Sequence, residues 1–355
     1  MELESTAVLV LACNRPAYLR RTLRSLFLHR GARRYPIFVS QDGTHAEVAS
    51  IIRSHPELCH LQHRPQPFGL WRTPRGWDGY HCIARHYRWA LSQVFDRLGF
   101  ERVIILEDDL EIAVDFFDYI EAAAGLLQRD PTIWTVSAWN DNGQARFVRD
   151  KEALFRSDFF PGLGWLLTRA LWNELSPKWP ATCWDDWLRE PAQRQGRVAI
   201  RPEVSRTHTF GRLGVSRGQF YDEHLRDIAL NASPVDFGAL DLGYLIRERY
   251  DPCLLARIER APLVCVAEAL ATDSACDQRI EYRDAASFSL IAARFGLMAD
   301  LRGGVPRTGY LGVVEFWYGS RRIFLVPAPA DGAARVTEQS AAPPQVTLER
   351  SLPFV

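Results

Sequence analysis

Three consecutive carboxylates, Glu107, Asp108 and Asp109, directly follow the apolar run 103–106. Ionised carboxylates at the end of a buried strand repel one another, and relief requires solvent, a raised pKa or a cation. The functional interpretation is a bound divalent ion, because oxygen ligands favour hard ions such as Mg²⁺ or Mn²⁺. A site with only one or two protein carboxylates leaves coordination positions on the ion for the phosphates of a nucleotide. Two other interpretations stay open from the residues alone: a solvated loop, and an N-terminal cap for a helix beginning near Val114.

A second acidic pair, Asp185 and Asp186, lies between Trp184 and Trp187. Indole rings can raise the pKa of a neighbouring carboxylate and can also stack on a sugar. A carboxylate in this position is a candidate general base for a hydroxyl nucleophile. The alternative is that Asp185 caps the helix that follows it.

The elements that must position these acids alternate along the chain. Almost wholly apolar segments are predicted as strands, and they cover 7–12, 37–39, 101–106 and 133–141. Helical patterns follow the first two strands, and a long helical pattern over 80–98 precedes the third. This alternation indicates an α/β fold with a parallel sheet covered on both faces.

Such sheets bind ligands at the carboxyl ends of their strands. The first predicted strand ends at 13–15, the second at Gln41 and Asp42, and the third at the acidic triplet 107–109. We therefore expect these residues to share one rim of the sheet.

The connecting segments are predicted from their turn residues. Residues 40–45 and 64–79 are predicted as loops, and 159–172 as a glycine-containing turn that enters a helix. Residues 205–220 contain three glycines and little periodicity, which predicts a long mobile loop of the kind that closes over substrates.

From about residue 248 the pattern changes to that of a smaller mixed domain, with a helix over 285–295 and a terminal hairpin around 318–320. The final segment is rich in Ala, Pro and polar residues and is not expected to fold. The predicted parts are a catalytic domain at 1–211, a substrate loop and linker at 212–247, the smaller domain at 248–327 and the tail at 328–355.

Composition narrows the function classes. The chain has 355 residues and a formal net charge of zero, so no electrostatic footprint for nucleic acid is visible and no nucleic-acid partner is expected. The seven cysteines are scattered without a zinc-type spacing; most are expected to be small buried hydrophobes, with one or two disulfides possible. The opening MELESTAVLVLAC is too short to span a bilayer, so no membrane segment is expected in this chain.

Several motifs together resemble those of the N-acetylglucosaminyltransferase I family. They are EDDLEIAVDFF, SAWNDNG, FFPGLGWLL, PKWP, WDDWLR and SRTHTFGRLGVSRGQF. The match runs in order from about Val8 to the region of Pro327 and leaves only the tail outside it. The resemblance implies a nucleotide-diphospho-sugar transferase fold of the GT-A type, with a mostly parallel sheet and a smaller C-terminal mixed domain.

The same resemblance implies roles for individual residues. Asp109 matches the last acid of the family's DxD-type motif, which is the direct protein ligand of Mn²⁺, and Asp185 matches the family's general base. Other residues match positions expected to contact the donor, UDP-N-acetylglucosamine. They are Arg15, Asp42, His86, Glu107, Asp108, Leu163, Trp184, Val215 and Ser216.

The chain also departs from the family pattern. Some relatives carry disulfide-forming cysteines where this chain has Gly43, Thr135 and Val198, so Cys13 lacks its expected partner. The resemblance implies a location in the Golgi lumen. The missing cysteines and the missing anchor weaken that inference, and a cytoplasmic location stays open.

The function implied by the resemblance is an inverting, Mn²⁺-dependent transfer of N-acetylglucosamine to the 2-hydroxyl of a terminal α-mannose on an N-glycan. One alternative is the related transferase that acts on O-mannosyl glycans. Another is a sugar-binding module that kept the fold without catalysis, and a third is a metal-dependent phosphohydrolase.

Overall fold

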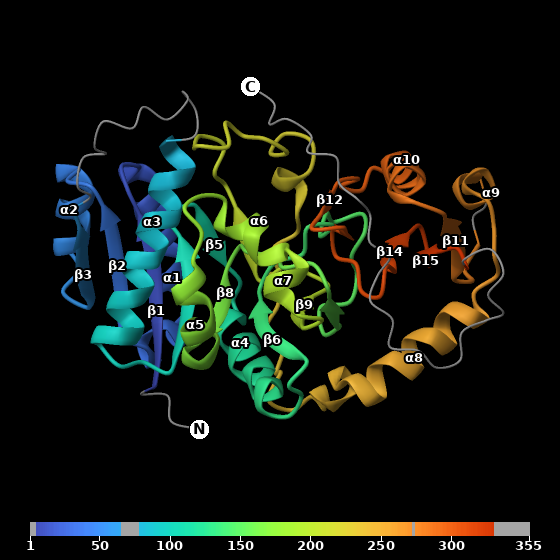
Figure 1. The fold of residues 1–355 in the computed structure, drawn as a ribbon, viewed down its shortest axis with the longest axis horizontal. Helices are drawn as coiled ribbons and strands as arrows, with labels where there is room; N and C mark the ends of the chain where they lie inside the picture. The colour runs from blue at the N-terminus through green and yellow to red at the C-terminus, as the bar shows by residue number, and fades with distance from the viewer. Residues whose placement is uncertain (1–4, 65–77, 272–273, 330–355) are drawn as a thin grey trace.

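The computed structural model describes residues 5–64, 78–271 and 274–329. Most of the predicted loop at 64–79 and almost all of the predicted tail at 328–355 lie outside these residues. The centre of the fold is an eight-stranded sheet with the strand order β3-β2-β1-β4-β8-β6-β9-β7 (Figure 1). Its strands are β1 (Thr6–Ala12), β2 (Ile37–Asp42), β3 (Leu58–His63), β4 (Arg102–Glu107), β6 (Ile133–Ser137), β7 (Leu154–Ser157), β8 (Trp165–Thr168) and β9 (Val198–Pro202).

The predicted α/β class with a mostly parallel sheet is confirmed. Strand β1 pairs in parallel with β2 and β4, β2 with β3, and β6 with β9. Strand β8 runs antiparallel to both β4 and β6, and β7 runs antiparallel to β9. The first half of the sheet is therefore purely parallel, and its carboxyl ends meet at one rim.

Helices cover both faces of this sheet, as the apolar strands require. On one face lie α1 (Pro16–Leu28), α2 (Ala46–Arg53) and α4 (Phe116–Ala124), which share a core with Val8 and Val10 of β1. On the other face lie α3 (Asp78–Ser92), α5 (Arg169–Leu175) and α6 (Trp184–Arg189), which share a core with Leu9. Alternate residues of β1 thus serve the two cores.

Helix α1 shows how local sequence sets this packing. It begins with Pro16, whose fixed φ suits the first helical turn. Leu19, Leu23 and Leu26 recur at helical spacing and are buried against the sheet. The positively charged Arg20 and Arg24 lie on the opposite face.

Two sequence predictions within this sheet are wrong, and one strand was missed. Strand β3 was not predicted, because it is an edge strand whose side chains are mostly polar and only partly buried. Residues 40–42 were predicted as a loop but continue strand β2. The turn predicted at 159–172 contains the four-residue strand β8, which is too short for periodicity to separate it from a helix.

The predicted substrate loop at 205–220 is also partly wrong. Its first part forms strand β10 (Thr207–Thr209), which pairs antiparallel with β5 (Leu110–Ile112). Strand β5 follows the acidic triplet directly. The pairing therefore brings the beginning of the glycine-containing segment next to that triplet.

The C-terminal part contains a smaller mixed sheet, as predicted. Strand β15 (Arg321–Pro327) pairs in parallel with β11 (Gln278–Tyr282) and antiparallel with β14 (Val314–Tyr318), which forms the predicted hairpin. The remaining elements are α7 (Pro191–Arg194), α8 (Arg247–Arg260), α9 (Val266–Ala271), α10 (Ala285–Phe295), β12 (Leu301–Arg302) and β13 (Val305–Pro306). Helix α8 runs along the lower edge of the view in Figure 1, from below the central part of the molecule to below the C-terminal sheet. The exact division of the chain into domains stays a prediction.

The expectation that most cysteines are buried is wrong. None of the seven, all of which lie within the described residues, forms a disulfide; Cys82 and Cys183 are partly exposed, and the other five are exposed. Cys59, for example, lies on edge strand β3, where its side chain reaches solvent. Within the described ranges, no helix has both the length and the apolar character needed to cross a bilayer.

Candidate active site

The acidic triplet lies at the carboxyl end of β4, beside the end of β1. The backbone N–H of Asp108 donates to the carbonyl of Leu11 at 3.0 Å, which holds the turn against β1. Arg15, just beyond β1, contacts Asp108 with one Nη atom and lies 2.8 Å from Oδ2 of Asp109 with the other. The expected common rim is therefore observed for the first and third predicted strand ends.

Asp108 and Glu107 are held in a poorly solvated environment. Burial, partly offset by Arg15, raises the pKa of Asp108 to about 6. Burial and the neighbouring charge of Asp109 raise the pKa of Glu107 to about 7. Oδ2 of Asp108 is buried and has no hydrogen-bond partner among the residues described. This arrangement favours a cation, because ionising these groups together is costly without one.

Both alternative interpretations of the triplet are contradicted. Asp108 is only 2% exposed, so the triplet is not a solvated loop. Helix α4 begins at Phe116 with Asp115 at its N-cap, and Asp115 makes no capping bond from its side chain. Asp115 instead pairs with the buried Arg206 at 3.1 Å. The triplet therefore does not cap this helix.

Tyr87 connects the triplet to the second acidic motif. Its hydroxyl donates to Oε1 of Glu107 at 2.6 Å, and its ring centroid lies 4.2 Å from that of Trp184. Burial, then Glu107, and further the charges of Asp185 and Asp109 raise the pKa of Tyr87. The two acidic motifs therefore border the same buried tyrosine.

Asp185 and Asp186 occupy the first turn of helix α6. Arg189 contacts both, at 2.9 Å from Oδ2 of Asp185 and 2.8 Å from Oδ1 of Asp186. The side chain of Asp185 remains 41% exposed, so a ligand can reach it. The N-cap of α6 is Cys183, in a left-handed conformation with φ 46°, so the capping interpretation of Asp185 is wrong.

Asp42 and His86 form a second cluster beside the end of β2. Nδ1 of His63 lies 2.7 Å from Oδ1 of Asp42, and Nε2 of His86 lies 2.7 Å from Oγ of Ser40. The rings of His63 and His86 are stacked with centroids 5.5 Å apart. Burial alone would raise the pKa of Asp42, but the hydrogen bond from His63 and the neighbouring charges of His86, His63 and Arg85 together outweigh it and lower that pKa. Burial lowers the pKa of His86 to about 4. His86 is therefore a neutral ring at pH 7.

Cys13 ties this cluster to the acidic triplet. It stands just after β1, and partial loss of solvent around the sulfur raises the pKa of its thiol to about 11, with smaller contributions from the charges of Asp42 and Asp108. Both carboxylates therefore lie near the same rim position.

His63 and Tyr87 were missed by the sequence analysis. Asp42 and His63 are register partners at the ends of β2 and β3, so a strand assignment at 58–63 would have placed them together. Tyr87 follows His86 directly and faces Trp184 from α3. The helical pattern of the sequence does not distinguish Tyr87 from an aromatic residue that only packs in the core.

The glycine-containing segment lies over the acidic triplet. A Cβ atom added to Gly211 would overlap the carboxylate of Asp109. The carbonyl of Leu213 accepts from Nη1 of Arg15 at 2.9 Å. The methyl groups of Val215 lie 2.7 and 2.8 Å from the Cβ position of Gly79 at the start of α3. This part of the predicted substrate loop therefore contacts Asp109, Arg15 and the start of α3.

The other predicted donor residues lie nearby or on the same segment. The carbonyl of Leu163 accepts from Oγ1 of Thr207 in β10 at 2.7 Å. The neighbouring Gly162 has its Cβ position 3.6 Å from the indole of Trp184. Ser216 is exposed on the glycine-containing segment, next to Val215.

The residues fit a cation that is shared with a substrate better than one held by protein alone. Within the described part of the chain, no cluster of three or more His, Cys, Asp or Glu side chains could hold a metal ion. Asp109 and the unpartnered oxygen of Asp108 offer at most two carboxylates. Hard divalent ions such as Mg²⁺ bind in this way, with one or two carboxylates and substrate phosphates.

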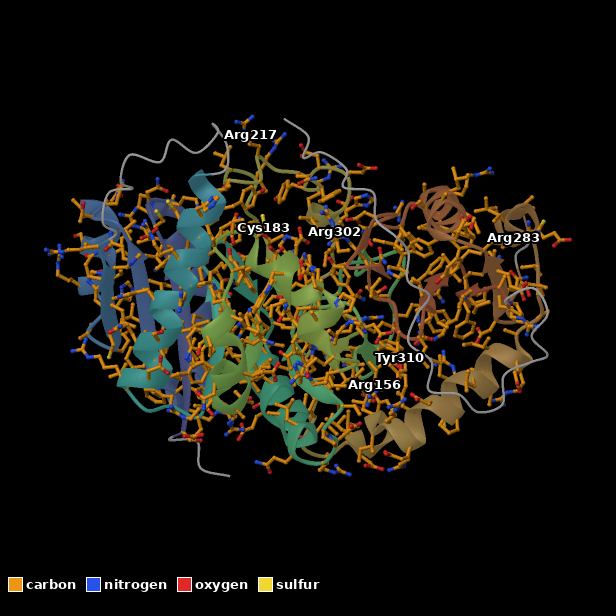
Figure 2. All side chains as sticks on the ribbon, viewed as in Figure 1. Arg156, Cys183, Arg217, Arg283, Arg302 and Tyr310 are labelled. Carbon is orange, nitrogen blue, oxygen red and sulfur yellow. The ribbon has the colours of Figure 1, made fainter. Side chains whose placement is uncertain are left out.

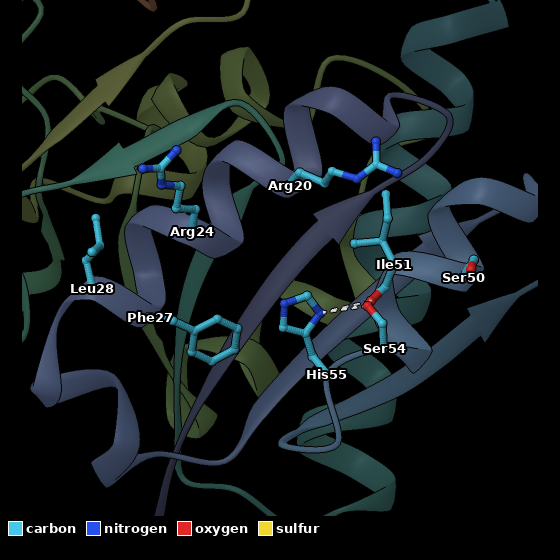
Figure 3. A pocket seen from close by; sticks show the side chains of 8 residues that line it. All are labelled: Arg20, Arg24, Phe27, Leu28, Ser50, Ile51, Ser54 and His55. Carbon is cyan, nitrogen blue, oxygen red and sulfur yellow. Dashed lines mark hydrogen bonds between the residues drawn. The ribbon is translucent and has the colours of Figure 1, made fainter.

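A groove of about 580 Å³ lies elsewhere on the described structure (Figure 3). It runs between α1 and α2, where Phe27 stacks on His55 with ring centroids 5.5 Å apart. None of the predicted site residues lines it. The chemistry of the chain therefore points to the rim of the sheet, not to this groove.

Comparison with known proteins gives the family. The sequence model of the GNT-I family matches residues 2–335. The alpha-1,3-mannosyl-glycoprotein 2-beta-N-acetylglucosaminyltransferase of Arabidopsis thaliana is 48% identical over 325 residues, which cover 90% of this chain and 73% of that protein.

Solved structures match less closely. A protein of Desulfovibrio desulfuricans G20 assigned as a nucleotide-diphospho-sugar transferase matches with a TM-score of 0.33 and 9% identity, over 56% of this chain and 79% of that one. Protein A197 from STIV matches with a TM-score of 0.34 and 10% identity, over 64% of this chain and 96% of that one. At these values neither structure decides the fold. The sequence matches do decide the family, and the chain belongs to the GNT-I family.

Proposed function

We propose that this protein transfers N-acetylglucosamine from UDP-N-acetylglucosamine to the 2-hydroxyl of a terminal α-mannose on an N-glycan, with inversion at the anomeric carbon. The observation that carries this proposal is the position of Tyr87, which bonds Glu107 and packs on Trp184. It supports a single site, in which the acids beside Glu107 serve the donor phosphates through a cation and the acid beside Trp184 faces the acceptor. The family relative from Arabidopsis thaliana is named for this activity.

The donor diphosphate would lie at the acidic rim. Asp109, with Asp108 beside it, would hold Mn²⁺, which when bound supplies Lewis-acid stabilisation of the leaving diphosphate. Arg15 would turn from these carboxylates towards the phosphates, because its guanidinium is already at the rim with 25% of its side chain exposed. Asp42 and the neutral His86 would contact the uridine portion.

The sugar of the donor would lie between the two acidic motifs. Glu107 and Asp108 would accept from ribose and sugar hydroxyls, and Trp184 would give an apolar wall. Leu163 lies in a turn whose glycines let a ligand approach the backbone. Val215 and Ser216 would cover the bound donor, which would then form part of the surface that the acceptor meets.

Asp185 would act as the general base. An uncharged mannose hydroxyl is a poor nucleophile, and its proton must move to a carboxylate as the new bond forms. The carboxylate of Asp185 is partly exposed and is oriented by Arg189, which is itself bonded through Nε to the carbonyl of Phe160 at 3.1 Å. In a single displacement the base takes the proton on one side while the diphosphate leaves on the other.

The proposed location is the Golgi lumen, by analogy with the secretory origin of N-glycan acceptors. The proposed division of the chain keeps the catalytic part at 1–211, the loop and linker at 212–247 and the smaller part at 248–327. Expression of each part by itself, followed by a thermal unfolding scan, tests the division. Fractionation of the native cells tests the location.

The activity is tested by incubating the protein with UDP-N-acetylglucosamine, Mn²⁺ and a five-mannose N-glycan, and by measuring product masses. We expect the mass of one added N-acetylglucosamine, and loss of at least about 100-fold in rate for Asp185→Asn. A mannosyl peptide serves as the second acceptor, and faster transfer to it would favour the O-mannosyl alternative. UDP release at equal rates with and without acceptor would favour a phosphohydrolase and contradict the proposal.

A further inference from the structure

A second groove has a volume of about 260 Å³. It lies between residues 220–224, at the end of the glycine-containing segment and just beyond it, and residues 293–300 of the C-terminal part. Its volume is slightly below the range of about 300–1,000 Å³ that is typical of small-molecule sites. The residues that give it chemical character are Phe220, Glu223, His224, Leu297, Met298 and Asp300.

This groove is joined to the acceptor side of the proposed site by one arginine. Nε of Arg302 lies 2.9 Å from Oδ2 of Asp300, and its Nη1 lies 3.5 Å from Oδ2 of Asp186. The turn after Arg302 packs on the end of α6, because the Cβ position of Gly303 meets the carbonyl of Arg189. Figure 2 labels Arg302 and Cys183, which precedes α6, on the same side of the molecule. A path of three side chains therefore leads from the acidic pair of α6 to the groove.

The polar groups of the groove suit neutral hydroxyls. His224 is only 8% exposed, and its Nδ1 has no hydrogen-bond partner among the residues described. Burial lowers the pKa of His224, so the ring is neutral near pH 7 and offers one donor and one acceptor. Glu223 adds acceptor oxygens, whereas both oxygens of Asp300 already accept from Arg302 and Arg307.

One wall of the groove is aromatic. Phe220 lines the groove and is half-buried, and the guanidinium of Arg307 lies 5.3 Å from the centroid of its ring. An aromatic face combined with hydrogen-bonding groups is the usual chemistry for a sugar ring.

We propose that this groove binds a second mannose branch of the glycan acceptor, while the reacting mannose lies at Asp185. The inference rests on the proposed function, because it assigns a further part of the same substrate. The groove is connected to the proposed acceptor site at Asp185 through the neighbouring Asp186, which pairs with Arg302, and through Asp300, which pairs with the same arginine. A branched glycan can occupy both places at once, whereas a single mannoside can occupy only the reacting one.

The test compares two acceptors, the five-mannose N-glycan and methyl α-mannoside, with Phe220→Ala and Glu223→Gln. For each protein, kcat/KM is measured for both acceptors at saturating donor, and the ratio of branched to single acceptor is calculated. We expect each variant to lower this ratio by about fivefold or more, mainly through KM for the branched glycan. The matched control is Arg283→Ala, an exposed residue before α10, which leaves the ratio unchanged.

The outcomes separate this inference from the proposed function. If the parent protein transfers sugar to neither acceptor, the proposed function is wrong. If the parent is active but the variants leave the ratio at the parent value, or lower both acceptors equally, the second branch does not bind in this groove. Thermal unfolding of each variant checks folding, and binding of the five-mannose glycan measured by ligand-observed NMR repeats the comparison without catalysis.

Discussion

Nη1 of Arg15 lies 2.8 Å from Oδ2 of Asp109, and its other Nη atom contacts Asp108. The proposed cation ligand is therefore already neutralised by a guanidinium. A divalent ion that binds alone must compete with this positive charge, whereas an ion that arrives with a diphosphate gives the guanidinium a new anionic partner. The pairing thus favours joint binding of cation and nucleotide.

This competition predicts opposite effects of Arg15→Ala on two ligands. Without the guanidinium, Mn²⁺ alone should bind several-fold more tightly, because one repulsive charge is removed. UDP in the presence of Mn²⁺ should bind about tenfold or more weakly, because the phosphates lose a charged donor. Electron paramagnetic resonance counts free Mn²⁺, and calorimetry gives UDP affinity. Weaker binding of both ligands would show that Arg15 supports the cation site.

Gly211 is predicted to be needed for its lack of a side chain. A methyl group there would overlap the carboxylate of Asp109, so Gly211→Ala must displace either the segment or the acid. We expect KM for the donor to rise by about tenfold, with little change in the free energy of unfolding. Gly214→Ala is the matched control, since its Cβ position is 3.4 Å from Nη1 of Arg15, an ordinary contact. Equal effects of the two substitutions would argue against a specific contact at Gly211.

Tyr87 is predicted to matter for both stability and transfer. Tyr87→Phe keeps the contact with Trp184 but removes the hydroxyl that donates to Glu107 at 2.6 Å. Loss of a donor to a poorly solvated carboxylate should lower the free energy of unfolding by about 1–3 kcal/mol. Chemical denaturation measures this, with Tyr318→Phe in the C-terminal sheet as control. If Tyr87→Phe lowers the free energy of unfolding by less than Tyr318→Phe does, Glu107 has found another hydrogen-bond donor.

His86 is predicted to make stability depend on pH. Its folded pKa is about 4 and its ordinary value is 6.5, so between these values the unfolded chain binds a proton that the folded chain does not. The free energy of unfolding therefore falls as pH falls from 6.5 towards 4, by on the order of 3 kcal/mol for this group. The difference between the parent and His86→Gln, measured by denaturation at pH 7.5 and 4.5, should shrink accordingly. A constant difference would show that His86 has the same pKa in the folded and the unfolded chain.

The sequence was most informative where apolar patterns are long. Strand β1 and helix α10 lie where the patterns predicted them, because each buries a continuous or periodic apolar set. Edge strand β3 exposes much of its polar surface, and β8 has four residues, so neither has a distinctive pattern. The carboxyl-end rule placed Arg15 beside Asp109 correctly, since parallel strands align their ends.

What the sequence could not supply were contacts between distant segments. His63 belongs to the cluster of Asp42 only because β3 pairs with β2 in that register. The role of Tyr87 as the connection between Glu107 and Trp184 depends on how α3 and α6 pack together on one face of the sheet. The groove beside Asp300 depends on segments about 80 residues apart and has no local signal in the chain.

The most direct test of the central claim measures UDP binding with and without Mn²⁺ for Asp109→Ala and Asp185→Asn, alongside transfer by the same proteins. If Asp109 serves the donor and Asp185 the acceptor hydroxyl, both variants lose transfer. Only Asp109→Ala then loses the gain in UDP affinity that Mn²⁺ provides. Donor binding that is lost in Asp185→Asn and kept in Asp109→Ala would contradict this division of labour.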